Sequence, residues 1–182
     1  MNLDSKNKLP IIMIGKGGHS DVLADIVALN NKKILKFIEY SEEESFFNTY
    51  EPNEVLLING IGISSKSNRR KEVLERYKNK GYTFTRVIHP SAIISKTVKL
   101  SNDIQIMAGV VINAYSKIGI NCILNTGVIV DHHCIIEDNI HIAPGAVLCG
   151  NVIVESNSFI GANSTLTQNT KITKDTKKTN SS

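Results

Sequence analysis

The chain has 182 residues, of which 41% are hydrophobic, enough apolar content for one ordinary domain or two small ones with a buried core. Its formal net charge of +4 is spread along the chain, and no apolar run approaches the ~20 residues that cross a bilayer, so neither nucleic-acid binding nor a membrane span is expected. Three cysteines, an odd number, indicate no disulfide framework, and we expect a cytoplasmic protein in which they are reduced.

Predicted strands and helices alternate in the first half of the chain. The stretch LPIIMIGKGGHSDVLADIVALNN predicts a buried strand, a Gly-rich turn and an amphipathic helix. Further strands are predicted over ILKFIEY, EVLLING and TFTRVI, with a basic helix over SNRRKEVLERYKNK that ends at Gly81. This order predicts a small parallel α/β domain of the mononucleotide-binding, Rossmann-like type over residues 1–87.

The turn GKGGHS is an incomplete dinucleotide-binding motif, because Ser20 stands where the third glycine would be. Two interpretations remain open. The turn is either a tight strand-to-helix connection or a phosphate site, in which Gly17 and Gly18 allow close approach of a ligand to the helix N-terminus. His19 either caps the turn or contacts that ligand.

The second half of the chain has a six-residue repeat. The residue phase that follows each repeat position, from His89 to Thr173, contains no Ile, Leu or Val, so general aliphatic richness does not explain the pattern. A period of six fits neither a helix nor a hairpin meander, and it favours a coiled β-solenoid in which each hexapeptide supplies one short strand and one corner. The aliphatic residues at every sixth position, expected to point inward, are Ile88, Ile94, Leu100, Ile106, Ile112, Ile118, Leu124, Val130, Ile136, Ile142, Leu148, Val154, Ile160, Leu166 and Ile172.

A second inward position is expected four residues after each aliphatic. It holds small or β-branched residues, as a narrow interior requires, and it includes Cys122 and Cys134. We therefore interpret these two cysteines as packing residues. For Cys134 this makes a role as covalent nucleophile improbable.

The hexapeptides IGINCI, IAPGAV and IGANST resemble those of the hexapeptide-repeat acyltransferases. The resemblance implies a left-handed parallel β-helix with 18 residues per coil and a homotrimer. We place this acyltransferase domain at residues 88–176 and expect residues 177–182 to form a disordered tail.

The order of the two halves sharpens the resemblance. A Gly-Gly-His turn in a small α/β domain, followed by VIHPSAIIS, NTGVIVDHHC and HIAPGAVLCGNV, is similar to bacterial sialic acid O-acetyltransferases and UDP-4-amino-sugar N-acetyltransferases. Their activity implies acetyl-CoA as co-substrate and a nucleotide-linked sugar as acceptor. The resemblance implies sugar-nucleotide contacts at Gly17, Gly18, His19, Glu39, Tyr40 and Gly62, and acetyl-CoA contacts at His141 and Ala162.

The stretch VDHHCIIEDNIHIAPG contains three histidines. His132 follows inward Val130 by two residues, so it is expected near a corner and not in the core. It is then a solvated histidine, a zinc ligand as in γ-carbonic anhydrases, or a general base, because imidazole with a pKa of about 6.5 accepts a proton at neutral pH. The spacing of His132, His133 and His141 does not match that of the carbonic anhydrases, and we expect no metal.

The resemblance implies that His132 is the general base. The acidic residue that usually follows it is replaced by His133, and Asp131 is an alternative partner for the imidazole. We expect direct acetyl transfer to an amino or hydroxyl group, with a backbone amide near APGA as oxyanion donor. The alternatives are a non-catalytic or degenerate scaffold that binds a nucleotide-sugar and, less favoured, a zinc enzyme. The sequence does not choose between nitrogen and oxygen as acceptor.

Overall fold

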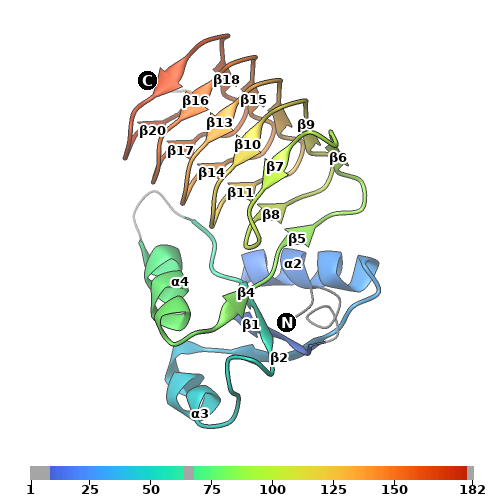
Figure 1. The fold of residues 1–182 in the computed structure, drawn as a ribbon, viewed down its shortest axis with the longest axis vertical. Helices are drawn as coiled ribbons and strands as arrows, with labels where there is room; N and C mark the ends of the chain where they lie inside the picture. The colour runs from blue at the N-terminus through green and yellow to red at the C-terminus, as the bar shows by residue number, and fades with distance from the viewer. Residues whose placement is uncertain (1–8, 64–67, 180–182) are drawn as a thin grey trace. The chain divides into compact units, whose positions relative to one another are not determined.

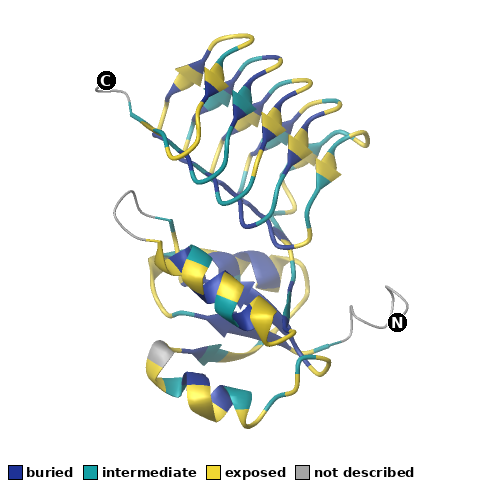
Figure 2. Cartoon of the chain, turned by 60° about the vertical axis from the view of Figure 1, so that its left-hand side comes forward, coloured by how far each residue is buried: buried dark blue, intermediate teal, exposed yellow. Residues whose placement is uncertain are grey.

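The computed structural model describes residues 9–63 and 68–179 and divides the chain into two compact units, 1–87 and 88–182 (Figure 1). The first unit is built on a parallel sheet in the order β2-β1-β3-β4. Its strands are β1 (Ile11–Ile14), β2 (Ile34–Ile38), β3 (Leu56–Asn59) and β4 (Thr83–Phe84). The two middle strands, β1 and β3, are buried along their whole length, as expected for central strands of a parallel sheet (Figure 2).

Three α-helices connect these strands: α2 (Gly18–Leu29), α3 (Glu43–Phe47) and α4 (Arg69–Asn79). Helices α2 and α4 agree with the sequence pattern. The sequence did not predict α3 or the 3₁₀ turn Tyr40–Glu42 before it, because five residues are too few for a helical period to show. Helix α3 is held by an aromatic cluster, in which the Phe46 ring lies 5.6 Å from that of Tyr77 and 5.2 Å from that of Tyr82.

The second unit is a parallel β-solenoid of about five turns, made of two-residue strands at six-residue spacing. Paired strands are 18 residues apart, as in Ile118↔Ile136, which confirms the predicted coil length. The first sheet contains β5 (Val87–Ile88), β8 (Gln105–Ile106), β11 (Ile123–Leu124), β14 (His141–Ile142), β17 (Phe159–Ile160) and β20 (Lys177–Lys178). The second contains β6 (Ile93–Ile94), β9 (Val111–Ile112), β12 (Ile129–Val130), β15 (Val147–Leu148) and β18 (Thr165–Leu166). The third contains β7 (Lys99–Leu100), β10 (Lys117–Ile118), β13 (Ile135–Ile136), β16 (Ile153–Val154) and β19 (Lys171–Ile172).

The predicted inward residues form the core of this solenoid. From Ile106 to Ile172 every repeated aliphatic is buried, and Ile88, Ile94 and Leu100 are partly buried against the same cluster. Each such side chain contributes roughly 1.5–3 kcal/mol when fully buried. Cys122 and Cys134 are also fully buried in this core, which confirms their predicted packing role.

Two boundaries differ from the prediction. The stretch TFTRVI is not one strand, because Thr83–Phe84 pairs with β3 whereas Val87–Ile88 joins the solenoid, where the His89 amide bonds to Ile106 O at 2.9 Å. The predicted disordered tail also starts too early. Lys177–Lys178 pairs with β17, and the Gly161 amide donates to Lys178 O at 2.7 Å, so the ladder continues into this segment. The left-handedness implied by the resemblance stays a prediction.

The corners between strands contain residues with positive φ. Most are Gly or Asn, which tolerate the left-handed region, and the exceptions in the solenoid are Tyr115, His133 and Asp175. Among the described residues, no helix has the length and apolar character needed to cross a membrane.

Candidate functional site

The α/β unit contains a cleft of about 630 Å³ at the carboxyl ends of β1, β2 and β3. In the order β2-β1-β3-β4, the chain passes from β1 to β2 on one side and then crosses to β3 on the other side of β1. Parallel sheets bind ligands at such a change of direction in the strand order. The cleft brings together five of the six residues that the resemblance implied for the nucleotide-sugar: Gly17, Gly18, His19, Glu39 and Gly62. Tyr40, the sixth, lies in the 3₁₀ turn, and its side chain is outside the described part of the structure.

Ser20 explains why the third glycine of the motif is absent. Its buried hydroxyl accepts a hydrogen bond from the Gly17 amide at 2.7 Å and donates to Gly17 O at 2.8 Å, which fixes the turn. The Gly17 amide is therefore already bound. The Gly18 amide, at the first position of α2, has no partner within the helix and is the donor better placed for a ligand phosphate.

Two glycines after β3 shape the opposite wall of the cleft. A Cβ on Gly60 would lie 2.9 Å from Ile14 O and 2.9 Å from Ser20 Cβ, so only glycine fits where β3 passes the start of α2. A Cβ on Gly62 would lie 3.5 Å from His19 Cβ, so the His19 side chain lies beside the Gly62 backbone. Residues 19 and 62 are thus neighbours although 43 positions separate them.

Arg70 and Asn59 hold this wall in place, a role that the sequence did not indicate. The buried Arg70 guanidinium donates through Nη1 to Asn59 O at 2.8 Å and to Ile61 O at 2.7 Å. Asn59 Nδ2 donates back to Arg70 O at 2.9 Å. The position of Arg70 inside a basic helix did not indicate a buried role, because most Lys and Arg side chains on such a helix are solvated.

Charged groups border the cleft at the end of β2. Lys16 Nζ lies 3.7 Å from Glu39 Oε1 and 3.7 Å from Glu42 Oε2, and Glu39 remains about half exposed. The Glu39 amide donates to Glu42 Oε2 at 2.9 Å, and this hydrogen bond lowers the pKa of Glu42. An acidic residue about 20 positions after the Gly-rich turn is where mononucleotide folds contact ribose hydroxyls.

His132 and His133 occupy a corner of the solenoid between β12 and β13, and both side chains are exposed. His132 Nδ1 lies 3.0 Å from His133 Nδ1, so one ring donates a hydrogen bond to the other. His133 has φ 60°, and its ring lies 5.1 Å from that of Tyr115 in the preceding coil. The expected corner position of His132 is confirmed, and its ring nitrogen contacts a second imidazole.

Asp131 supports the backbone of this corner. Its Oδ1 accepts hydrogen bonds from Asn113 Nδ2 at 3.0 Å and from the His132 amide at 2.8 Å. These two bonds, with Asn113 first, lower the pKa of Asp131. Of the two neighbours considered for the His132 ring, His133 contacts the imidazole, whereas Asp131 hydrogen-bonds the backbone amide of His132 and not its ring.

Gly150, in the coil that follows, lies directly against the His132 ring. A Cβ at this position would be 2.6 Å from His132 Cε1 and 2.7 Å from Nε2, so the absence of a side chain makes room for the imidazole. The Gly150 amide makes no hydrogen bond to any residue in the described ranges. The sequence analysis missed this residue, because a glycine near a corner is ordinary in such a repeat.

The amide expected near APGA is not available as an oxyanion donor. Ala143 donates to Ile160 O at 2.8 Å, Gly145 to Thr126 O at 2.9 Å and Ala146 to Ala143 O at 3.3 Å. Pro144 has no N–H. This part of the prediction is wrong, because the amides of a regular coil are bound to neighbouring coils and corners.

Cys134 follows the two histidines but points into the core, where its Sγ donates to Cys149 O at 3.2 Å. Burial raises the pKa of this thiol, which keeps it protonated and a poor nucleophile. No group of three or more His, Cys, Asp or Glu side chains that could hold a metal occurs in residues 9–63 and 68–179.

His141 and Ala162 lie elsewhere on the solenoid. His141 is on β14, where its Nε2 accepts a hydrogen bond from Asn125 Nδ2 at 3.2 Å and its ring meets the Phe159 ring edge to face. Ala162 is at the exposed corner after β17. His132 lies at the corner that follows the second sheet, so one chain does not bring the two implied acetyl-CoA contacts next to it.

Comparisons with known proteins agree with this architecture. Residues 133–168 match the family described as bacterial transferase hexapeptide (six repeats). The acetyltransferase domain of PglB from Neisseria gonorrhoeae FA1090, solved with acetyl coenzyme A, has a TM-score of 0.80 and 25% identity over 89% of this chain and 83% of that chain. A histidine-to-asparagine variant of perosamine N-acetyltransferase from Caulobacter crescentus, solved with CoA and GDP-perosamine, has a TM-score of 0.76 and 22% identity over 90% of this chain and 91% of that chain. The resemblance to hexapeptide-repeat sugar acetyltransferases is thereby confirmed.

Proposed function

We propose that this hexapeptide-repeat protein is an enzyme that transfers the acetyl group of acetyl-CoA to an amino or hydroxyl group of a nucleotide-linked sugar, with His132 as general base. The observation that carries the proposal is the 3.0 Å contact between His132 Nδ1 and His133 Nδ1 at an exposed corner. The similarity to the PglB acetyltransferase domain, solved with acetyl coenzyme A, supports the reaction class.

The proposed role of His132 requires a particular proton position on each ring. For His132 to act as a base, its proton must be on Nδ1 and be donated to His133 Nδ1, which leaves the lone pair of Nε2 for the acceptor. His133 then carries its own proton on Nε2. A neutral imidazole stabilises the His132 imidazolium less than a carboxylate would, so His133 acts mainly by orienting the base.

The reaction needs no acyl-enzyme. The acceptor nitrogen or oxygen attacks the thioester carbonyl while His132 Nε2 takes its proton. The tetrahedral intermediate then collapses, the carbon–sulfur bond breaks, and His132 returns the proton to the departing CoA thiolate. The Gly150 amide, which lies beside the ring and has no other acceptor in the described ranges, is the donor we assign to the oxyanion.

The cleft of the α/β unit is the proposed site for the nucleotide part of the sugar. Its Gly18 amide at the start of α2 suits a phosphate, and Glu39 after β2 suits the hydroxyls of a ribose. His19 and Gly62 form the wall between these contacts. The nucleotide is uridine or guanosine diphosphate, and residues 1–87 form the nucleotide-sugar domain of a cytoplasmic enzyme.

A homotrimer of left-handed β-helices would complete the site. The outward residues of the second sheet, Ile93, Val111, Ile129 and Val147, form an apolar ladder in which Ile93 is 68% and Ile129 40% exposed. If this face packs against the first sheet of the next copy, the His132 corner meets the partner's His141 and Ala162. Such a heterologous contact closes into a ring. Acetyl-CoA would then lie between two copies.

Thioester cleavage measured with acetyl-CoA and a panel of UDP- and GDP-linked amino sugars tests the proposal. We expect turnover with at least one acceptor, and a fall of about 10²–10⁴-fold in His132→Ala, because that is the contribution of a positioned base. His89→Ala, a solenoid histidine bound to Ser91 Oγ at 2.7 Å, is the matched control and should keep full activity. No thioester cleavage with any acceptor of the panel would favour the scaffold alternative. Full turnover in His132→Ala would exclude His132 as the base.

A further inference from the structure

A second pocket, of about 380 Å³, lies on the solenoid surface beside the histidine pair. It extends from the His133 corner towards the two coils that precede it and shares no residue with the cleft in the α/β unit. Its lining residues are Thr97, Lys99, Tyr115, Lys117, His133 and Ile135.

Two lysines face outward together on one wall of this pocket. Lys99 and Lys117 are register partners on neighbouring strands, which places their side chains on the same face at the strand spacing of about 4.8 Å. Like charges directly opposite each other in a sheet are unfavourable. Lys171, on the same sheet, is by contrast paired with Glu155 at 2.6 Å, whereas neither pocket lysine pairs with a carboxylate of the described residues.

Asp131, the acid that precedes the histidine pair, forms no ion pair with these lysines in the described residues. The Asp131 carboxylate is at the same corner, but its hydrogen bonds go to the Asn113 side chain and the His132 amide. The residues that line the pocket include no Asp or Glu. The pocket therefore has a local excess of positive charge.

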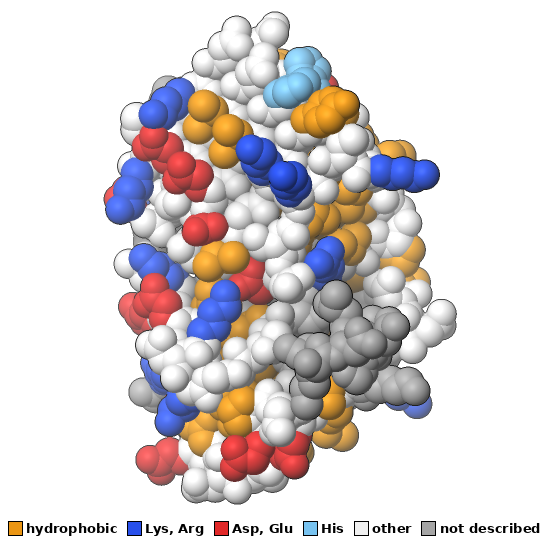
Figure 3. Space-filling view, in the orientation of Figure 1, with side chains coloured by type: hydrophobic (Ala, Val, Ile, Leu, Met, Phe, Trp, Pro, Cys, Tyr) orange, Lys and Arg blue, Asp and Glu red, His pale blue; other side chains and the backbone are white. Residues whose placement is uncertain are grey.

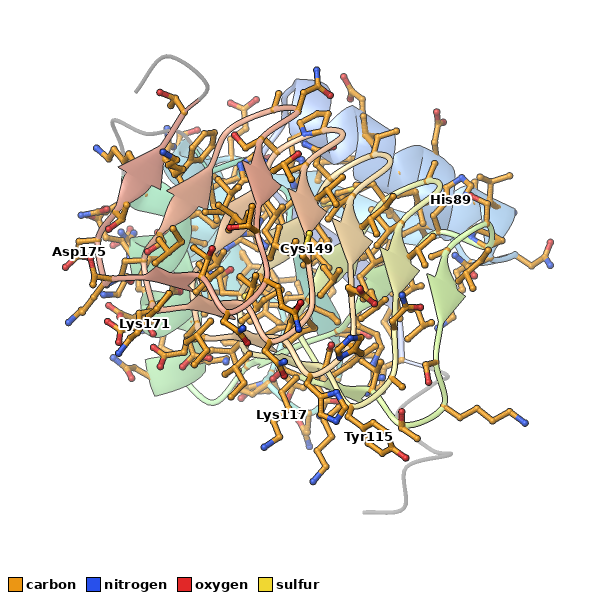
Figure 4. The ribbon with its side chains drawn as sticks, turned by 90° about the horizontal axis from the view of Figure 1, so that it is seen from above. His89, Tyr115, Lys117, Cys149, Lys171 and Asp175 are labelled. Carbon is orange, nitrogen blue, oxygen red and sulfur yellow. The ribbon has the colours of Figure 1, made fainter. Side chains whose placement is uncertain are left out.

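Tyr115 occupies a position that is unfavourable for a bulky residue. It has φ 63°, at a corner where the same stack of coils has Asn151 and Asn169, and its side chain is 59% exposed. Unlike Asn or Gly, a tyrosine does not favour the left-handed backbone region, and an exposed ring gains no stability from burial. Figure 4 shows Tyr115 and Lys117 on the same side of the solenoid with their side chains projecting outward, and Figure 3 shows Lys or Arg side chains near histidine and hydrophobic ones on one face. Strained residues of this kind are characteristic of binding sites.

We infer that this pocket is an anion subsite for the acceptor, in which Lys99 and Lys117 bind a carboxylate or phosphate group and Tyr115 packs against the attached ring. The inference rests on the proposed function for the statement that the ligand is an acceptor. It adds the substrate class: the sugar, or the group linked to it, is negatively charged near the reacting centre.

Binding of matched probe pairs by titration calorimetry at low salt tests the inference. UDP-glucose is compared with UDP-glucuronic acid, and GDP-mannose with GDP-mannuronic acid, because each pair differs only at C6, where a carboxylate replaces the hydroxymethyl group. We expect one acidic probe to bind about tenfold more tightly than its neutral partner, as one charge-assisted contact provides. Lys99→Gln/Lys117→Gln should abolish that difference and leave the neutral probe unchanged. Lys171→Gln/Lys174→Gln, which removes the same charge outside the pocket, should preserve it.

Inorganic pyrophosphate distinguishes the two sources of the anion. If the pocket lysines are needed for pyrophosphate binding and not for the carboxylate preference, the pocket binds a phosphate group, and the phosphate contact proposed at the Gly18 amide is wrong. The inference would be overturned if every probe binds equally well with and without Lys99 and Lys117, or if no probe binds at all. Turnover that requires His132 but not these lysines would reject the subsite alone, whereas lysine-dependent binding without turnover would reject the enzyme alone.

Discussion

At the scale of single residues, the proposed site has His133 where the family resemblance implies an acid. His133 reaches His132 because its backbone has φ 60°, a conformation that turns the chain at the corner and directs one imidazole towards the other. The same backbone position is filled by Asn151 in the next coil. This offers substitutions that remove the ring and keep the turn.

We predict that His133→Gly lowers kcat at least about tenfold, since removing the residue that orients a catalytic imidazole costs up to ~10⁴ in serine protease triads. Glycine adopts the left-handed corner without strain, so the loss would not come from misfolding. His133→Asn should recover part of the activity, because its carbonyl oxygen can accept the proton of His132 Nδ1. Steady-state kinetics measure both variants, and unchanged kcat in His133→Gly would rule out this role.

Tyr115 gives a prediction about stability. Asn favours the left-handed region that costs other residues roughly 1–2 kcal/mol, so Tyr115→Asn should be about 1 kcal/mol more stable than Tyr115→Ala. Both variants lose the ring and its contact with His133, and their difference therefore isolates the backbone cost. Urea unfolding provides the comparison, and equal midpoints with equal slopes would show that the corner is not strained.

At the element scale, each coil of the solenoid can be nearly regular because its strands are two residues long and its corners repeat. The proposed site is formed where a coil departs from that regularity. The residue one coil after His132 is Gly150, which has no side chain. The space that a Cβ would fill is occupied by the imidazole of His132.

Gly150→Ala should therefore lower kcat more than tenfold while changing the free energy of unfolding by no more than about 0.5 kcal/mol. The exposed ring can swing away from the new methyl group, which relieves the clash but displaces the base. In a double-mutant cycle, adding Gly150→Ala to His132→Ala should cost little further activity. Additive losses would show that the effect of Gly150→Ala is not transmitted through the His132 ring.

At the scale of the whole molecule, one chain holds the proposed base and the proposed acetyl-CoA contacts on different parts of the solenoid. His141 is on the first sheet, and His132 is at the corner after the second. A trimer in which each site uses two copies resolves this separation, and it would also cover the apolar ladder that contains Ile93 and Ile129.

The assembly is tested by Ile129→Glu. We expect the wild type to sediment as three copies of the 20.0 kDa chain, and the variant to dissociate and lose turnover, because a buried unpaired charge is strongly unfavourable at an interface. Val22→Glu, an equally exposed apolar residue on α2, is the control and should remain assembled. A monomeric wild type with full activity would contradict the trimer and the shared site.

The solenoid could be predicted from the amino-acid sequence alone, because its contacts join residues one coil apart and every coil repeats the same aliphatic positions. The sequence also indicated the Gly-rich turn and the parallel strands, whose local patterns are strong. The contacts that follow no such local pattern are visible only in the folded structure. Ser20 occupies the Gly17 amide, Arg70 supports the β3 loop, and Gly150 makes room for His132, and each is a contact between segments whose spacing follows no local period. Which neighbour contacts the ring of the proposed base, His133 and not Asp131, likewise depends on side-chain directions at one corner, which are set by the neighbouring coils and cannot be read from adjacent positions in the sequence.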